Sequence, residues 1–333
     1  MLNILVTIPK LSAVFDTFFD DKRIKELESI GNVIWNVSEK QFTKGELTEK
    51  LKDIDVCVTG WGTPVMEEEV LANANRLRLI AHTGGSVKPY VTDACFEREI
   101  RVVSGNTVFA ESVAEGVIAY ALTSLRDIPK FSDELKQGIW PEHFYNRGLL
   151  ERKVGIVGYG MIARYVVSML KPFHCEIKVF SRHIATAELE KHQMEKATLE
   201  EIFSTCDIIS IHSGMTPENY HLITEELLNC MKPGTLLINT ARGAIIDEVA
   251  LIKVLNRKEI HAALDVYETE PLPPNHPLLE CENALLLPHM GGPTIDRRLS
   301  VTSSVIADIH NFLEGKSLIC EISAAYAAKM SMY

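Results

Sequence analysis

Short apolar runs alternate with amphipathic stretches along the first hundred residues of the chain. The runs have the length and the β-branched, aromatic composition of strands. They read ILVTI, NVIWNV, DVCVT, RLRLIAH and IRVVS, and helices are predicted between them near residues 20–30, 42–52, 64–73 and 90–97. This alternation predicts parallel βα units.

A second series of the same kind begins at Lys153. Its strands are predicted in KVGIVGYG, EIKVFSR, DIISIHS, TLLINTA, HAALDV and NALLLPH, and its first helix in IARYVVSMLK. Between the two series, residues 109–126 are apolar on much of a helical circumference and predict a buried helix. Residues 127–148 are aromatic and irregular in pattern, and we interpret them as a connector.

The final amphipathic stretch predicts a helix over 294–315 that packs back on the first domain. The fold class is therefore α/β, with two doubly wound parallel-sheet domains. The boundaries are expected near 104 and 297. One domain then comprises residues 1–103 and 298–333, and the other comprises residues 104–297.

Composition and charge narrow the function classes. A chain of 333 residues is long for one core, which agrees with two domains. The net charge of −11 disfavours nucleic acid and anionic membrane surfaces as partners, so a site for an anionic ligand needs its own positive charge. No apolar run is expected to be long enough to cross a bilayer. The seven cysteines are scattered and form no CxxC motif, which predicts a reducing compartment and no metal site. The N-terminus, MLNILVTIPK, lacks a basic leader, which favours the cytoplasm.

A glycine turn stands between the first strand and first helix of the second series. Gly158, Gly160 and Ala163 form the pattern GxGxxA. The first glycine permits a tight turn, the second lets the backbone approach a pyrophosphate, and the small third residue allows close helix–strand packing. Free N–H groups at the helix start attract phosphates. The turn predicts a dinucleotide site; an S-adenosylmethionine site or a purely structural turn are the alternatives.

The next strand indicates which dinucleotide is bound. A strand that selects NAD usually ends in Asp or Glu, whereas this one ends in Ser181 and Arg182. Serine removes the repulsion of a 2′-phosphate, and a guanidinium can bind that phosphate. We therefore favour NADP over NAD, with a solvated surface arginine as the alternative interpretation.

Three side chains downstream carry the candidate chemistry. Arg242 follows a predicted strand at the sheet edge where α/β ligands bind, and it could hold a substrate carboxylate bidentately. His289 also follows a strand and precedes Gly291, which gives a ligand close access, so it suits a general acid and base. Either Glu268 or Glu270 could hydrogen-bond His289 and stabilise its charged ring, and the spacing does not choose between them.

Asp265 ends the predicted strand HAALDV. Its carboxylate could accept from the carboxamide of a nicotinamide, or it could cap a turn. An arginine, a carboxylate and an imidazole beside a dinucleotide are what hydride transfer to or from a 2-hydroxy acid needs. A methyltransferase that uses the glycine turn would leave these three groups unexplained.

Taken together, the motifs resemble the D-isomer-specific 2-hydroxyacid dehydrogenases, a family that includes phosphoglycerate dehydrogenases and glyoxylate/hydroxypyruvate reductases. The resemblance covers essentially the whole chain and runs through LRLIAHTGGSV, ESVAEGVIAYAL, VGIVGYGMIAR, CMKPGTLLINTARGAIIDE, AALDVYETEP and LLLPHMGG. The family loop GxGxDN reads Gly84-Gly85-Ser86-Val87-Lys88-Pro89 here, which leaves the substrate open.

The resemblance implies a flavodoxin-like substrate domain, an inserted Rossmann domain and a homodimer. It implies that Arg242 anchors the substrate, that Glu270 rather than Glu268 partners the histidine, and that His289 is the acid and base. The cofactor-binding residues that it implies, with those from the turn and strand ends, are Gly158, Gly160, Met161, Ile162, Ser181, Arg182, Ser213, Thr240, Ala241, Asp265 and Gly291. The substrate would be met by Arg242, His289 and the backbone of Gly84, Gly85 and Ser86.

The predicted function is an NAD(P)-dependent oxidoreductase that transfers hydride between nicotinamide and a small 2-hydroxy or 2-oxo acid of the glyoxylate, hydroxypyruvate or phosphoglycerate type. The physiological direction stays open. The alternative is a non-catalytic, dinucleotide-binding redox sensor that resembles a corepressor.

Overall fold

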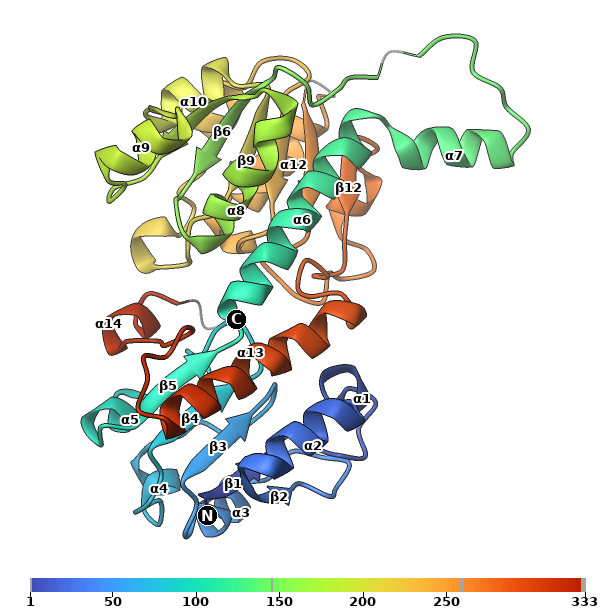
Figure 1. Ribbon diagram of the computed structural model, residues 1–333. Helices are drawn as coiled ribbons and strands as arrows, with labels where there is room; N and C mark the ends of the chain where they lie inside the picture. Colours follow the sequence, from blue (N-terminus) through green and yellow to red (C-terminus); the bar gives the residue numbers. More distant parts are fainter. Residues whose placement is uncertain (1, 145, 258–259, 331–333) are drawn as a thin grey trace. The chain divides into compact units, whose positions relative to one another are not determined.

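The chain folds into two compact units, which are Met1–Ser112 with Pro293–Tyr333, and Val113–Gly292. The structure is a computed structural model that describes residues 2–144, 146–257 and 260–330 (Figure 1). Met1, Tyr145, residues 258–259 and residues 331–333 lie outside the described residues. Tyr145 belongs to the predicted connector, and residues 331–333 end the predicted first domain.

The first unit is built on a parallel sheet of order β2-β1-β3-β4-β5. Its strands are β1 (Leu2–Val6), β2 (Gly31–Trp35), β3 (Val56–Thr59), β4 (Leu79–His82) and β5 (Arg101–Ser104). Its helices are α1 (Phe15–Phe18), α2 (Asp21–Ile30), α3 (Lys44–Lys50), α4 (Glu68–Leu71), α5 (Asp93–Glu97), α13 (Ile295–Leu313) and α14 (Ala324–Ala327). This strand order is the flavodoxin-like one, as predicted.

Alternating side chains of each strand enter two separate cores in the first unit. In β4, Leu79 and Ala81 join one cluster and Ile80 joins the other, as the two-residue period of a strand requires. Helix α13 covers the first of these faces with Val301 and Val305 and contacts α1 and α2. The prediction that the final helix packs on the first domain is therefore confirmed.

The second unit contains a parallel sheet of order β12-β11-β10-β9-β6-β7-β8 in its described residues. Its strands are β6 (Lys153–Val157), β7 (Glu176–Phe180), β8 (Glu195–Lys196), β9 (Ile208–Ile211), β10 (Leu236–Asn239), β11 (His261–Leu264) and β12 (Ala284–Leu286). Its helices are α8 (Met161–Leu170), α9 (Thr186–His192), α10 (Leu199–Thr205), α11 (Glu225–Asn229) and α12 (Glu248–Leu255), with 3-10 turns η1 (Lys171–Phe173), η2 (Pro217–Asn219), η3 (Gly243–Ile245) and η4 (Pro277–Glu280). This is the Rossmann order, so the predicted fold class is confirmed.

Helix α6 (Asn106–Leu125) contains the division between the units. By length and composition it could cross a membrane, so the expectation that no apolar run is long enough is wrong. Its second half instead packs into the core of the second unit through Ala114, Val117 and Ala121. We interpret α6 as a core helix, because such burial explains its apolar composition.

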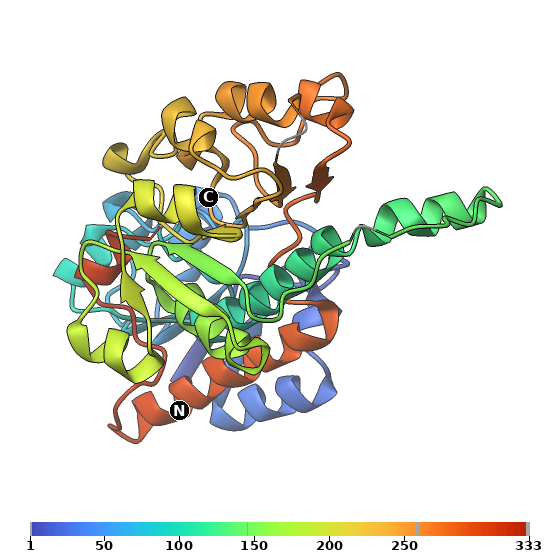
Figure 2. The same cartoon turned by 90° about the horizontal axis from the view of Figure 1, so that it is seen from above.

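The predicted connector 127–148 is wrong for its first part, because helix α7 (Ile128–Lys136) forms there. Pro129 lies in the first turn, where its missing N–H costs no hydrogen bond. Figures 1 and 2 both show α7 and the following loop standing away from the sheet of the same unit. The helix buries none of its residues. We call residues 127–144 and 146–148 the arm. Most of the apolar and aromatic side chains that suggested an irregular connector are exposed on it.

Candidate active site

Three neighbouring strands of the second unit end at one edge of its sheet. Strands β10, β11 and β12 are adjacent and parallel. The segments that leave their carboxyl ends carry Arg242, Glu270 and His289 respectively. Ligands of doubly wound sheets bind at this edge, so the sheet brings the three predicted residues to the expected place.

Glu270 and His289 form a direct pair. The Nδ1 atom of His289 lies 2.6 Å from Oε2 of Glu270, and the other carboxylate oxygen accepts from the backbone N–H of Tyr267 at 3.0 Å. His289 has a φ of +52°, a left-handed conformation that is costly for a residue with a β-carbon. Its side chain is 46 % exposed, so the Nε2 side of the ring has access to a ligand. The choice of Glu270 over Glu268 follows from this geometry.

Asp265 anchors the turn after His289. Its two carboxylate oxygens accept the backbone N–H groups of Met290 and Gly291, both at 2.7 Å. Burial raises the pKa of Asp265, while these two backbone hydrogen bonds act in the opposite direction. The turn-capping interpretation of Asp265 is therefore confirmed, and contact with a nicotinamide carboxamide stays a prediction.

Arg242 presents a guanidinium that forms no ion pair with any residue that the structure describes. Its Nη1 donates to the carbonyl of Ala241 at 2.5 Å, and its Nε is buried without a hydrogen-bond partner among the described residues. Burial lowers the pKa of Arg242, and the negative charge of Glu270 partly offsets this effect. Desolvating an unpaired cation is costly, and an anionic ligand would remove that cost.

Gly243 and Tyr267, which the sequence analysis did not single out in these roles, join the segments that carry the triad. A β-carbon on Gly243 would lie 1.9 Å from the carbonyl carbon of Tyr267 and 2.4 Å from the nitrogen of Glu268. The buried hydroxyl of Tyr267 accepts from the N–H of Leu287 at 3.0 Å and lies 2.9 Å from the carbonyl oxygen of Leu287. The Arg242 and His289 segments thus both contact the loop that carries Glu270. Two features of the sequence could have indicated these roles: Gly243 directly follows Arg242, and Tyr267 is the one aromatic residue in an acidic loop.

The glycine turn has the open geometry that a diphosphate needs. Gly158 has a φ of +92°, and a β-carbon there would lie 2.6 Å from the backbone nitrogen of Ser213. A β-carbon on Gly160 would meet no atom within 4 Å. Gly160 caps helix α8 without a side-chain hydrogen bond, so the N–H groups of Met161 and Ile162 face this open space at the helix start. The turn therefore fits a dinucleotide.

The strand end that was predicted to select the cofactor is at the surface. Arg182 is exposed, and its Nη2 donates to Oδ1 of Asn219 at 3.1 Å. Asn219 in turn donates to the carbonyl of Gly214 at 2.7 Å. The hydroxyl of Ser181 lies 3.4 Å from the backbone nitrogen of His183. The arginine is therefore held against the loop that follows β9.

Thr240 and Ala241 are both buried between β10 and Arg242. The N–H of Ala241 donates to Oδ1 of Asn239 at 3.0 Å, and the hydroxyl of Thr240 is buried without a partner in the described part of the chain. An unpaired hydroxyl at this edge is available to a ligand. A place for both residues beside the nicotinamide stays a prediction.

The predicted substrate loop, Gly84 to Ser86, follows β4 in the first unit. A β-carbon on Gly84 would lie 2.2 Å from Nε2 of His82, so only glycine fits over this ring. The Nδ1 of His82 lies 3.0 Å from the hydroxyl of Thr59, and the ring packs on Tyr90 with centroids 4.8 Å apart. Sequence analysis missed His82, a histidine at the end of an apolar strand.

His82 makes the stability of the first unit depend on pH. Burial lowers the pKa of His82 to about 3, whereas an unfolded histidine titrates near pH 6.5. The unfolded chain therefore binds the proton first, and the stabilisation is complete above about pH 6.5 and is lost as the pH falls toward 3. We expect the free energy of unfolding to fall by up to about 1.4 kcal/mol per pH unit from this group in that window.

Urea unfolding at pH 7, 6 and 5 measures this loss. The His82→Gln variant is less stable at pH 7 but should show a shallower decline, while a variant of the exposed His183, His183→Gln, should keep the wild-type slope. Parallel slopes for the wild type and His82→Gln would contradict the assignment.

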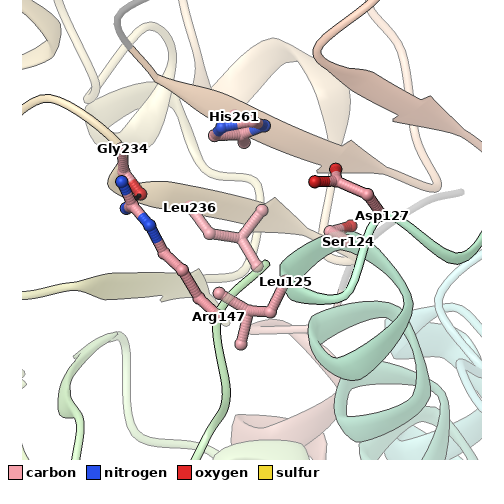
Figure 3. A pocket seen from close by; sticks show the side chains of 7 residues that line it. All are labelled: Ser124, Leu125, Asp127, Arg147, Gly234, Leu236 and His261. Atoms are coloured by element: carbon pink, nitrogen blue, oxygen red, sulfur yellow. Dashed lines mark hydrogen bonds between the residues drawn. The ribbon is translucent and has the colours of Figure 1, made fainter. Parts of the chain in front are cut away.

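A separate small hollow lies at the opposite edge of the second sheet (Figure 3). Its lining includes Leu236 and His261, which begin β10 and β11, and Arg147, whose N–H donates to the carbonyl of Leu125 at 2.8 Å. The guanidinium of Arg147 also contacts the carbonyl of Gly234. The contact with Leu125 holds the C-terminal end of the arm, at Arg147, against the C-terminal end of α6. The hollow is thus at the root of the arm, at the amino ends of the strands, away from the triad.

A Rossmann sheet with an open glycine turn, and with a cation and an acid–base pair at its carboxyl edge, is the arrangement of nicotinamide-dependent dehydrogenases. Comparison with known families agrees with this class. Residues 118–291 match the family described as D-isomer specific 2-hydroxyacid dehydrogenase, NAD binding domain. The chain belongs to the D-isomer-specific 2-hydroxyacid dehydrogenase family, and the resemblance seen in its motifs is confirmed.

Relatives with assigned names support this membership. The chain is 33 % identical over 319 residues to a D-3-phosphoglycerate dehydrogenase of Methanocaldococcus jannaschii, covering 95 % of this chain but 58 % of that protein. It is 32 % identical over 303 residues to a glyoxylate reductase of Thermococcus litoralis, covering 88 % and 91 % of the two chains. Among solved structures, the TT0316 protein of Thermus thermophilus superposes with a TM-score of 0.79 at 28 % identity, covering 97 % of this chain and all of that one.

Proposed function

We propose that the protein is an NAD(P)-dependent D-2-hydroxyacid dehydrogenase that reduces a small 2-oxo acid or oxidises the corresponding 2-hydroxy acid. The observation that carries the proposal is the half-buried guanidinium of Arg242, which lacks a counter-ion among the described residues beside a paired Glu270 and His289. A substrate carboxylate would supply the missing negative charge. Relatives named glyoxylate reductase and D-3-phosphoglycerate dehydrogenase support this substrate class.

In the reductive direction, Arg242 binds the carboxylate of the 2-oxo acid and fixes the position of C2. His289 donates a proton to the carbonyl oxygen as C2 is reduced, and Glu270 stabilises the charged imidazole through its 2.6 Å contact with Nδ1. The first turn of α8, from Gly160 to Ile162, would hold the pyrophosphate, and Asp265, Thr240 and Ala241 would line the nicotinamide end. A bound reduced nicotinamide supplies the hydride. A role for the backbone of Gly84 to Ser86 in binding the substrate stays a prediction.

A panel assay tests this proposal. The protein is mixed with NADH or NADPH and with glyoxylate, hydroxypyruvate, pyruvate or 3-phosphohydroxypyruvate, and nicotinamide absorbance is followed. Turnover of at least one acid is expected. Tight cofactor binding without turnover of any acid would contradict the proposal and favour the redox-sensor alternative.

NADP is the preferred cofactor in this proposal. The exposed Arg182 lies in a fixed position against Asn219, and Ser181 places no charge beside it. Replacing Ser181 with aspartate should repel a 2′-phosphate and shift the preference toward NAD by roughly 1–3 kcal/mol, measured as the ratio of kcat/KM for the two cofactors. Ser181→Ala is the matched control, since it removes the hydroxyl without adding charge. An unchanged ratio in Ser181→Asp would remove both residues from cofactor selection.

The exposed arm supports the predicted homodimer. Leu135, Ile139, Trp140 and Phe144 are between 50 % and 76 % exposed on α7 and the following loop. An exposed apolar surface of this kind marks an interaction site, and a second copy of the chain is the partner that we propose. Light scattering should give a dimeric mass for the wild type and a monomeric mass for a Leu135→Ser, Trp140→Ser double variant. A monomeric wild type, or a variant that stays dimeric, would contradict the arm as the interface.

A cytoplasmic location also belongs to this proposal. All seven cysteines are free thiols, and all but Cys230 are at least partly buried. Unpaired thiols persist in reducing compartments, which supports the location.

A further inference from the structure

Two histidines and two glutamates of the second unit form a hydrogen-bonded cluster beside the triad. Nε2 of His221 lies 2.7 Å from Oε1 of Glu268, and Nε2 of His276 lies 3.2 Å from Oε1 of Glu248. The side chains of His276 and Glu248 are only 18 % and 12 % exposed. We call these four residues the His–Glu joint. Among the described residues no group of three such side chains is placed to hold a metal ion, so the joint is a hydrogen-bonded network.

The two glutamates also exchange backbone hydrogen bonds. The N–H of Glu248 donates to Oε1 of Glu268 at 3.3 Å, and the N–H of Glu268 donates to Oε2 of Glu248 at 3.2 Å. Because Glu248 is the first residue of α12, the carboxylate of Glu268 also lies at the positive end of that helix. Each glutamate therefore fixes the backbone of the other.

The joint connects the segments that carry the triad. Glu268 lies two positions before Glu270, and Glu248 begins α12, which follows the turn after Arg242. The N–H of His221 donates to the carbonyl of Ala244 in η3, within that same turn, at 2.9 Å. Movement of either segment would break several of these contacts at once.

The stability of the His–Glu joint depends on each of its four side chains, because two of them are carboxylates that lie close together. Two neighbouring carboxylates repel each other unless positive charge lies between or beside them. Each histidine contacts one carboxylate through Nε2 and can donate a hydrogen bond to it. Removing one member leaves a partly buried charge without its partner, which is more costly than the loss of an exposed ion pair.

We propose that the four residues of the His–Glu joint are positioning residues. They hold the turn after Arg242 and the loop that carries Glu270 in a fixed position relative to each other, so that Glu270 contacts His289. This rests on the proposed dehydrogenase function. None of the four residues needs to touch the substrate or the cofactor. Their effect acts through the orientation of Glu270 and Arg242.

The Glu268→Gln and Glu248→Gln variants test the proposal, because glutamine keeps the size of the side chain and removes its charge. Glu225→Gln is the matched control, since Glu225 pairs with Lys253 at 3.0 Å on the exposed surface between α11 and α12. Activity is measured well below the unfolding midpoint of each variant. The two joint variants should lose about tenfold or more in kcat, because small displacements of reacting groups have large effects. Cofactor Kd should stay within about twofold, and Glu225→Gln should match the wild type in both.

A double-mutant cycle and a spectroscopic signal complete the test. The losses from His221→Gln and Glu268→Gln should not add in the double variant, since the two residues act as one pair. The NMR resonance of the His289 Nδ1 proton should shift in the joint variants and not in Glu225→Gln. Wild-type kcat and an unshifted His289 signal in both joint variants, or a lower unfolding midpoint as their sole change, would overturn the proposal. If the wild type reduces no 2-oxo acid, the proposed function fails, while the His289 signal still tests the joint.

Discussion

Replacing His289 with asparagine is expected to lower kcat for a 2-oxo acid by roughly 10²–10⁴-fold, the usual contribution of a positioned general acid. Asparagine can keep a hydrogen bond to Glu270 but cannot release a proton to the substrate. The dissociation constant of the cofactor should change little, because His289 lies on the segment after β12 and the glycine turn lies after β6. Stopped-flow turnover and cofactor fluorescence titration measure the two quantities.

The exposed His183 provides a control for this experiment, since it lies in the same unit at the end of another strand. His183→Asn should keep the wild-type kcat. Full activity of His289→Asn would show that another group transfers the proton, and would remove His289 from the mechanism.

Replacing Gly243 with alanine is expected to have a comparable effect on activity without altering any reacting group. The new β-carbon would lie 1.9 Å from the carbonyl carbon of Tyr267 and 2.1 Å from its oxygen. These are backbone atoms, so the peptide that precedes Glu270 must move. A displacement of about 1 Å at a catalytic group can reduce the rate about 10²-fold, and overpacking costs about 1–3 kcal/mol of stability.

Gly148→Ala is the matched control, because a β-carbon on Gly148 would meet no atom of the described residues within 4 Å. Turnover and the free energy of unfolding in urea should both fall for Gly243→Ala and stay at wild-type values for Gly148→Ala. Wild-type turnover in Gly243→Ala would show that the position of the Tyr267 peptide does not control the triad.

The framework of the site could be predicted because it depends on local patterns. Alternation in segments such as Leu79 to Ala81 identifies strands, and residues such as Arg242 and His289 follow such strands directly. Parallel strands bring their carboxyl ends to one edge, so a prediction of strands is also a prediction of where these side chains meet. Family resemblance then selected Glu270 over Glu268, which spacing had left open.

The contacts within the site could not be predicted in this way. The two oxygens of Asp265 bond to N–H groups 25 and 26 residues further along the chain, and the hydroxyl of Tyr267 reaches Leu287. Such contacts depend on the three-dimensional course of loops, which have no period in the sequence. Helix α7 was missed for a different reason. Ile128, Phe131 and Leu135 recur at helical spacing, but the segment was interpreted together with the aromatic, irregular residues that follow it.

The first unit is assembled from both ends of the chain, and this has a consequence for synthesis on the ribosome. Its five strands are complete once Ser104 has been made, and α1 and α2 can cover part of one face, but the part of that face over β4 and β5 stays uncovered until α13 (Ile295–Leu313) has emerged. The second unit is one continuous stretch and can reach its native state earlier. A stalled nascent chain whose first 292 residues have left the ribosome, while α13 is still held inside it, should therefore carry a protease-resistant Rossmann unit beside an N-terminal segment that still binds chaperones.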